Sequence, residues 1–155
     1  MARDFTGGGN CIQFANTITP TSSNFSVSAW VNLNGQDDVA NDGRIVCALG
    51  QTNSEDQNFY FGCDNYDAAE NTKLQFGTVQ GNGGDRDEVE STSEIAITGY
   101  VHVGFTFDGT DVRFYINGVL DRTVALGDTV YTDGTQKFMI GHRRDGGQTD
   151  IDMDG

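Results

Sequence analysis

Residues 100–120, YVHVGFTFDGTDVRFYINGVL, constrain the fold of this 155-residue chain more than any other segment. Apolar side chains alternate with polar or small ones along them, which is the period of an extended strand. Asp108-Gly109 supplies one tight turn, and Asn117-Gly118 supplies residues that tolerate the positive φ of a two-residue hairpin turn. The segment therefore predicts three consecutive strands in a β-meander. The side chains predicted to face the core are Val101, Val103, Phe105, Phe107, Val112, Phe114 and Ile116.

Short strand signals recur along the whole chain, separated by turn-forming residues. They lie at residues 10–15, 25–33, 44–50, 59–63, 73–79, 95–97, 100–107, 111–116, 119–126 and 137–141. Residues 45–49 are apolar on both faces, which predicts a central strand of a sheet that is covered on both sides. The polar stretches 34–43 and 80–94 are interpreted as surface loops. No segment keeps a helical apolar period, so we expect an antiparallel two-sheet sandwich with little or no helix.

Composition favours one soluble domain with many tight turns. Glycine occurs 21 times and proline once, as expected where short strands are joined by turns. The formal net charge of -14 disfavours nucleic acid as a partner, because an acidic surface repels a phosphate backbone. No apolar stretch approaches the roughly 18 residues of a membrane span. Residues 1–9 lack the apolar segment of a secretory signal peptide.

The cysteines are predicted to be structural. Cys11, Cys47 and Cys63 are an odd number at irregular spacing, without a C-x-x-C motif or a nearby pair of histidines. This pattern indicates neither a zinc site nor a complete disulfide framework. We expect buried free thiols that pack as small apolar side chains.

Several segments resemble the laminin-G-like and pentraxin-like branch of the concanavalin A-like jelly rolls. Residues 100–120 are similar to that family's pattern W-x-H-V-A-x-x-Y-D-G followed by V-x-L-Y-V-N-G, with Tyr100 in place of the tryptophan. MARDFTGGGNCIQF at the start, FSVSAWVNL at residues 25–33 and KFMIGHRRDG at residues 137–146 resemble three further strands of the family. The resemblance implies an all-β, two-sheet antiparallel jelly-roll sandwich of the lectin and glucanase type, formed as a single domain over residues 1–155.

The end of the chain differs from the family pattern, because family members continue past the equivalent of Gly155 into one more strand. The resemblance therefore implies a domain that lacks its final C-terminal strand. We expect a fragment of a longer protein. The alternative is that another chain supplies the strand, since an open sheet edge invites pairing.

The last residues, DIDMDG, contain one candidate calcium site. Asp150, Asp152 and Asp154 match the first half of a D-x-D-x-D-G loop, in which alternating carboxylates converge on one cation. The alternative is a solvated strand end. The same residues are also faintly similar to the E-x-D-x-E strand of glycoside hydrolases with this fold, which need two carboxyl groups about 5 to 5.5 Å apart. Three aspartates depart from that pattern, so we expect no enzyme.

The resemblance to pentraxins implies another calcium site, built from two loops. Asp56 and Asn58 precede one predicted strand, and Asp145 follows the late strand. Arg143 and Arg144 stand where pentraxins carry oxygen ligands, and arginine cannot bind calcium. We therefore expect at most one Ca²⁺ ion, bound with low affinity, and no other cofactor.

Aromatic side chains are the other candidate ligand-binding groups. Trp30 shares its strand face with Ser26, Ser28 and Asn32, where an indole can stack on a sugar or pack beneath the loops. We favour packing. His102 is interpreted as a packed or hydrogen-bonded core histidine and not as a general base. The remaining aromatic candidates are Tyr60, Tyr66 and Tyr131.

The opening M-A-R-x-F-x-G resembles the laminin-G-like modules of bacteriophage virions. This resemblance implies a non-enzymatic structural or decoration module of a capsid or tail, located in the virion after assembly in the host cytoplasm. Its partners would be other virion proteins, copies of itself and host-surface glycans. The alternatives are a calcium-dependent carbohydrate-binding module and, less favoured, a glycoside hydrolase.

Overall fold

The computed structural model describes residues 12–17, 24–33, 44–50, 57–63, 72–79, 86–96, 98–127, 130, 137–143 and 151–152. Within these ranges β-strands, joined by turns and short connections, are the only regular secondary structure, which confirms the predicted all-β class. The strands are β1 (Ile12–Thr17), β2 (Asn24–Val31), β3 (Arg44–Gly50), β4 (Gln57–Cys63), β5 (Lys73–Val79), β6 (Arg86–Glu94), β7 (Val101–Asp108), β8 (Asp111–Ile116), β9 (Val119–Ala125), β10 (Lys137–Ile140), β11 (His142–Arg143) and β12 (Ile151–Asp152). No helix suited to crossing a membrane occurs in these ranges.

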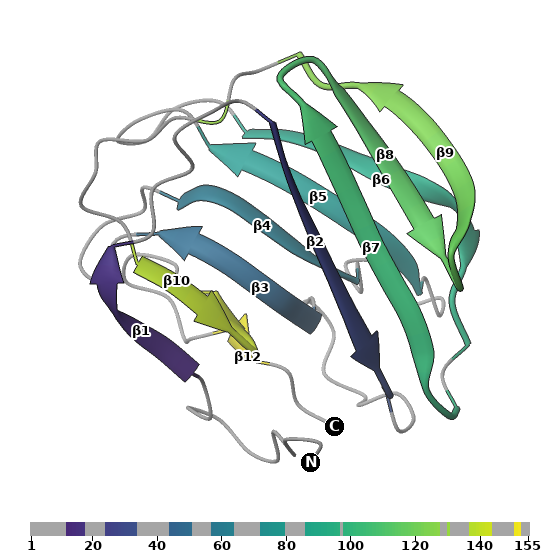
Figure 1. The fold of residues 1–155 in the computed structure, drawn as a ribbon, viewed down its shortest axis with the longest axis horizontal. Helices are drawn as coiled ribbons and strands as arrows, with labels where there is room; N and C mark the ends of the chain where they lie inside the picture. Colours follow the sequence, from purple (N-terminus) through teal and green to yellow (C-terminus); the bar gives the residue numbers. More distant parts are fainter. Residues whose placement is uncertain are drawn as a thin grey trace.

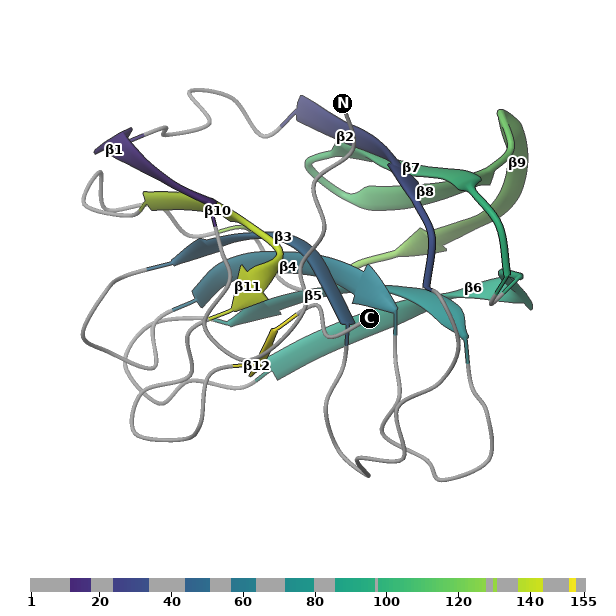
Figure 2. The same cartoon turned by 90° about the horizontal axis from the view of Figure 1, so that it is seen from below.

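The strands form two antiparallel sheets that pack face to face. One sheet has the order β1-β10-β3-β4-β5-β6, and the other has the order β2-β7-β8-β9. Figure 2 shows them as two layers, with β2, β7, β8 and β9 above β3 to β6. The short strands β11 and β12 form a separate pair beside β3. The predicted jelly-roll sandwich is therefore confirmed.

The predicted meander is formed by β7, β8 and β9, which are neighbours in the four-stranded sheet (Figure 1). Its turns use the expected residues: φ is 92° at Gly109, 51° at Asn117 and 78° at Gly118. These positive values explain why glycine and asparagine stand there. The inward side chains of β7 and β8 face the core as predicted: Val103, Val112 and Phe114 are at 0% exposure, and Ile116 is half-buried against the core.

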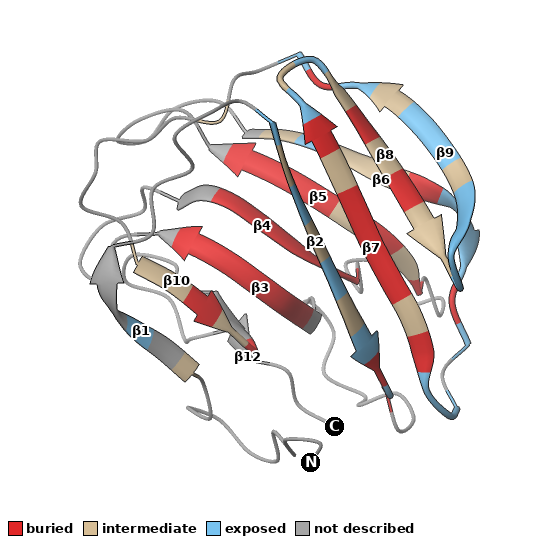
Figure 3. Ribbon diagram, viewed as in Figure 1, coloured by how far each residue is buried: buried red, intermediate tan, exposed pale blue. Residues whose placement is uncertain are grey.

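An aromatic core fills the space between the sheets. Phe105 of β7 lies 4.7 Å from Phe76 of β5 and 4.9 Å from Phe61 of β4, measured between ring centroids. Phe25 of β2 packs edge-on against Phe105 at 5.6 Å. Figure 3 shows the buried residues along β3, β4, β5 and β7. Each buried phenylalanine stabilises the fold by about 1.5–3 kcal/mol, so this cluster holds the two sheets together.

Strand β3 is buried on both faces, as predicted for residues 45–49. Cys47 and Leu49 join the main core between the sheets. Ile45 and Ala48 join a second cluster on the opposite face, together with Tyr60 and Met139. Gly77 makes room there, because a Cβ at this position would lie 2.3 Å from the Tyr60 ring. Strand β3 also has a neighbour on each side, β10 and β4, as a central strand requires.

The described cysteines are free and buried, which confirms the prediction for Cys47 and Cys63. Burial raises the pKa of the Cys47 thiol to about 12, because the apolar core disfavours a thiolate. Cys11 lies outside the described residues.

Two parts of the strand prediction are wrong. Residues 86–94, interpreted as part of a surface loop, form β6 at the edge of the six-stranded sheet. Residues 95 and 96, predicted as strand, follow β6 and belong to no strand. Ile95 is nevertheless anchored, because its N–H donates to the Thr72 carbonyl at 3.0 Å and its own carbonyl accepts from Thr72 Oγ1 at 2.9 Å.

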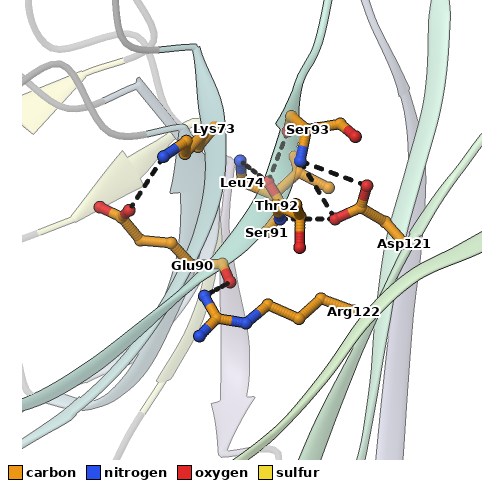
Figure 4. Close-up of polar contacts among 8 residues, drawn as sticks. All are labelled: Lys73, Leu74, Glu90, Ser91, Thr92, Ser93, Asp121 and Arg122. Atoms are coloured by element: carbon orange, nitrogen blue, oxygen red, sulfur yellow. Dashed lines mark hydrogen bonds and ion pairs between the residues drawn. The ribbon is translucent and has the colours of Figure 1, made fainter.

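Side chains of β9 bind the backbone of β6, which explains how so polar a segment forms a strand (Figure 4). The Asp121 carboxylate accepts from the Thr92 N–H at 2.6 Å and from the Ser93 N–H at 3.2 Å. Arg122 Nη1 donates to the Glu90 carbonyl at 2.8 Å. Unpaired edge groups of β6 are thus satisfied by side chains of the other sheet.

Candidate ligand-binding site

Large apolar side chains are exposed together at one end of the four-stranded sheet. Trp30 is 67% exposed and Tyr100 is 60% exposed. Leu120, at the start of β9, is 51% exposed. Val31 pairs with Val101, and Val103 pairs with Ile116, which pairs with Val119. The end of β2, the start of β7 and the β8–β9 hairpin therefore lie at the same end of the sheet, on the right of Figure 1. Such a cluster on a protein surface is a candidate binding site.

Strand alternation places Trp30 on the outer face of this sheet. Along β2 the exposed positions alternate with half-buried ones, so Ser26, Ser28 and Trp30 point outward while Phe25 and Val27 pack against the core. The sequence predicted this polar face from the alternation of Ser26, Ser28 and Trp30. The indole at its end is the one large apolar side chain on that face.

His102 of β7 is the partner of Trp30 across the sheet. The two residues are opposite one another in the β2–β7 register. Their ring centroids are 5.2 Å apart with an angle of 51° between the planes. The backbone of His102 is held by Asn117, whose Oδ1 accepts from the His102 N–H at 3.1 Å and whose N–H donates to the His102 carbonyl at 2.7 Å. The imidazole therefore supports one side of the indole.

These positions correct two interpretations of the sequence. Trp30 is not packed beneath loops, because two thirds of its surface is exposed. His102 is not a core histidine, because it lies half-buried on the outer face, while Val101 and Val103 on either side of it are buried. Both residues share a face that period-two alternation defines, but alternation does not tell whether a face is covered.

Gly104 forms the floor beside the two rings. It is opposite Ser28 on β2 and opposite Tyr115 on β8. A Cβ at Gly104 would lie 2.9 Å from the Val27 carbonyl oxygen and 3.1 Å from Ser28 Cβ, so glycine lets β2 and β7 approach closely. Tyr115 in turn is opposite Leu120 of β9. We call the group at this end the aromatic platform; its members are Trp30, Tyr100, His102, Gly104, Tyr115 and Leu120.

One charged side chain beside the platform, Arg113, lies two positions before Tyr115 on β8 and pairs with carboxylates of the same sheet. Arg113 Nη1 donates to Asp108 Oδ2 at 2.6 Å, and its Nη2 lies 3.7 Å from Asp111 Oδ2. The pKa of Asp108 is lowered to about 2, first by the hydrogen bond from the Asp111 N–H and then by that from Arg113. The platform itself is an apolar surface with hydroxyl groups at its margin, which suits stacking on a sugar ring.

The other predicted aromatic candidates do not join the platform. Tyr60 is 1% exposed, and its hydroxyl donates to Glu88 on the six-stranded sheet, so it offers no surface for stacking. Tyr66 and Tyr131 lie outside the described residues. Tyr100, Tyr115 and Leu120 were not predicted as site residues. The outward position of Tyr115 could have been found from alternation along β8, whereas that of Leu120 depends on the irregular β8–β9 register.

The predicted calcium ligands fall almost entirely outside the described part of the chain. This applies to Asp56, Asp145, Asp150 and Asp154. The structure places the backbone of Asn58 in β4 and that of Asp152 in β12. Among the described residues no three His, Cys, Asp or Glu side chains could hold a metal ion together. Both calcium sites, and with them the hydrolase interpretation of the three aspartates, stay predictions.

Comparison with known proteins places these features in a family. The family described as the concanavalin A-like lectin/glucanases superfamily matches residues 6–154. No curated protein matches this chain.

Solved structures share the fold at low sequence identity. A carbohydrate-binding module of the Ruminococcus gnavus IT-sialidase, bound to α2,3-sialyllactose, is 12% identical with a TM-score of 0.63, over 84% of this chain and 70% of that chain. A pentraxin from Limulus polyphemus is 16% identical with a TM-score of 0.61, over 97% and 68% of the two chains. Domain 4 of a Geobacillus stearothermophilus arabinanase, in complex with arabinotriose, is 18% identical with a TM-score of 0.56, over 88% and 60%.

Proposed function

This chain belongs to the concanavalin A-like lectin/glucanase superfamily, and we propose that it is a non-enzymatic module that binds carbohydrate at the aromatic platform. The observation that carries the proposal is the 67% exposure of Trp30, a large apolar side chain on an otherwise polar strand face. Complexes of two neighbours, with sialyllactose and with arabinotriose, support a sugar as the class of ligand.

The recognition mechanism follows from the geometry of the platform. The indole face stacks against the C–H groups of a sugar ring, and removal of both apolar surfaces from water drives binding. The ring of His102, 5.2 Å from the indole, restricts the orientations open to Trp30 and so reduces the entropy lost on binding. Ser28 and Tyr115, on either side of Gly104, bring hydroxyl groups that can hydrogen-bond the sugar.

The test is the loss of binding in Trp30→Ala. The wild-type protein is applied to an array of oligosaccharides, and the affinity for the best ligand is measured by NMR titration. Trp30→Ala should weaken binding at least tenfold, which corresponds to about 1.4 kcal/mol. Because the side chain is mostly exposed, the free energy of unfolding should change by no more than about 0.5 kcal/mol.

Thr123→Ala is the matched control, since Thr123 is an exposed residue of the same sheet, opposite Arg113 and outside the platform. It should bind as the wild type does. Unchanged affinity in Trp30→Ala would rule out the platform as the sugar site. Trp30 is the single tryptophan of the chain, so its fluorescence offers an independent report of ligand contact.

Calcium dependence distinguishes this proposal from the lectin alternative. The described residues of the platform include no carboxylate, so binding at Trp30 should persist in the presence of a chelator. Loss of binding on chelation would favour a calcium-dependent site built from residues such as Asp56, Asn58 and Asp145.

A structural role on a virion is the second candidate. It rests on the resemblance of the first residues, M-A-R-x-F-x-G, to phage modules. Exposed side chains such as Trp30 and Leu120 would serve protein contacts as well as glycan contacts. Mass spectrometry of purified particles, with this chain present or absent, tests the role directly.

A further inference from the structure

The platform carries no fixed charge although the chain as a whole is strongly acidic. We infer that it selects uncharged glycans and discriminates against those that carry a carboxylate, such as sialylated or uronic-acid sugars. This inference rests on the proposed function and adds the chemical class of its ligand.

The two arginines of the four-stranded sheet already have partners. Strand β2 contains no charged residue, and the only basic residues of β7, β8 and β9 besides His102 are Arg113 and Arg122. Arg113 contacts Asp108 at 2.6 Å and Asp111 at 3.7 Å. Arg122 donates to the Glu90 carbonyl of the other sheet at 2.8 Å. Arg113 is already paired with carboxylates, and Arg122 is directed to the other sheet, so we expect neither to make at the platform the bidentate contact by which arginine recognises a carboxylate.

The net negative charge of the chain also disfavours acidic glycans. The formal net charge is -14, so the long-range field repels an anionic ligand and slows its association. The sequence that follows β2, residues 34–43, contributes Asp37, Asp38 and Asp42 and no lysine or arginine. A neutral sugar, by contrast, meets the indole without an electrostatic cost.

Matched pairs of sugars test this selectivity. Lactose is compared with 3′-sialyllactose, and xylotriose with glucuronosyl-xylotriose, at low ionic strength, where electrostatic effects are least screened. At least one neutral member should bind, and its acidic counterpart should bind at least fivefold more weakly. Equal or tighter binding of the acidic member would overturn the inference while leaving the proposed function intact. Binding of neither pair, nor of any arrayed glycan, would overturn both.

A charge introduced beside Tyr115 sharpens the test. Leu120 is 51% exposed and lies opposite Tyr115, so Leu120→Arg adds a cation to the platform with little effect on the core. Leu120→Gln is the matched control, which adds a polar side chain without the charge. Leu120→Arg should raise the affinity for the acidic member at least threefold relative to Leu120→Gln, without a matching rise for the neutral member. An equal change for both members would contradict the role of charge.

Discussion

Asp108 shows how one side chain organises the turn between β7 and β8. Its Oδ1 accepts from the Asp111 N–H at 2.8 Å and from the Thr110 N–H at 3.1 Å, while Oδ2 accepts from Arg113 at 2.6 Å. These bonds favour the ionised carboxylate, and they hold its pKa at about 2, below the ordinary value of 3.8. Asp108 therefore does more than favour a turn before Gly109: its carboxylate also holds the start of β8 through these three hydrogen bonds.

A titration of Asp108 tests this arrangement. Because its pKa is lowered in the folded state, its contribution to stability is complete above about pH 4 and is lost as pH falls toward about 2. Carboxyl ¹³C shifts recorded between about pH 6 and pH 2 should show Asp108 still ionised at about pH 3. Arg113→Gln should raise its pKa. Titration of wild-type Asp108 near its ordinary value would contradict the hydrogen-bonding pattern.

At the scale of elements, β6 and β9 close one side of the sandwich. Each is the last strand of its own sheet, and Asp121 and Arg122 of β9 bind the backbone of β6. Burial acts to raise the pKa of Asp121, but hydrogen bonds from Ser93 and Thr92 outweigh it and the net pKa is lowered. The contacts explain why β6 needs few apolar residues. Val89 packs against the core, while Ser91 Oγ accepts from the Leu74 N–H at 2.9 Å.

Asp121→Asn should loosen this edge. The amide has one acceptor oxygen in place of two and carries no negative charge, so its hydrogen bonds to the N–H groups of Thr92 and Ser93 should be weaker than those of the carboxylate. We expect a loss of about 0.5–1 kcal/mol, since the site is partly solvated, and a fall in Tm of about 1–4 °C. Thermal melting measures the loss, and hydrogen exchange at Thr92 and Ser93 should accelerate. Glu94→Gln removes one negative charge at the exposed end of β6, as Asp121→Asn does in β9, and should have little effect on Tm. Equal losses of stability in the two variants would argue against a stabilising role for the hydrogen bonds between Asp121 and β6.

At the scale of the whole molecule, the two sheets share one core that also encloses the described thiols. Cys47 is 2% exposed and Cys63 is 4% exposed, and both belong to the cluster between the sheets. Side chains of both layers contribute to this cluster, for example Phe76 and Phe105. The thiols can therefore react only when the sheets separate.

Thiol labelling should report global unfolding. In a Cys11→Ser variant, Cys47 and Cys63 should resist a thiol reagent under native conditions, both through burial and because the Cys47 pKa of about 12 leaves little thiolate. Labelling should rise with denaturant along the same curve as the loss of β-structure seen by circular dichroism. Rapid labelling of the native protein would show that the core opens locally.

The candidate site shows what sequence could predict of function. Alternation along residues 24–31 placed Trp30 on a polar face, and this was correct. Its exposure, and its contact with His102, 72 positions later in the chain, depend on which strands become neighbours and on what covers them. Leu120 reaches the same surface through the β8–β9 register, which includes an irregularity between Phe114 and Tyr115 that no local pattern indicates.

By itself the sequence determined the all-β class, the meander of residues 101–125, the double-sided burial of β3 and the buried thiols, because periodicity, turn chemistry and apolarity act over a few neighbouring residues. Only the tertiary structure decided that residues 86–94 form a strand and that Trp30 is exposed. The physical reason is common to both. Polar edge strands and exposed surfaces depend on partners distant in sequence. Asp121 meets Thr92 only when the two sheets assemble, and His102 meets Trp30 only when β2 and β7 pair within one sheet.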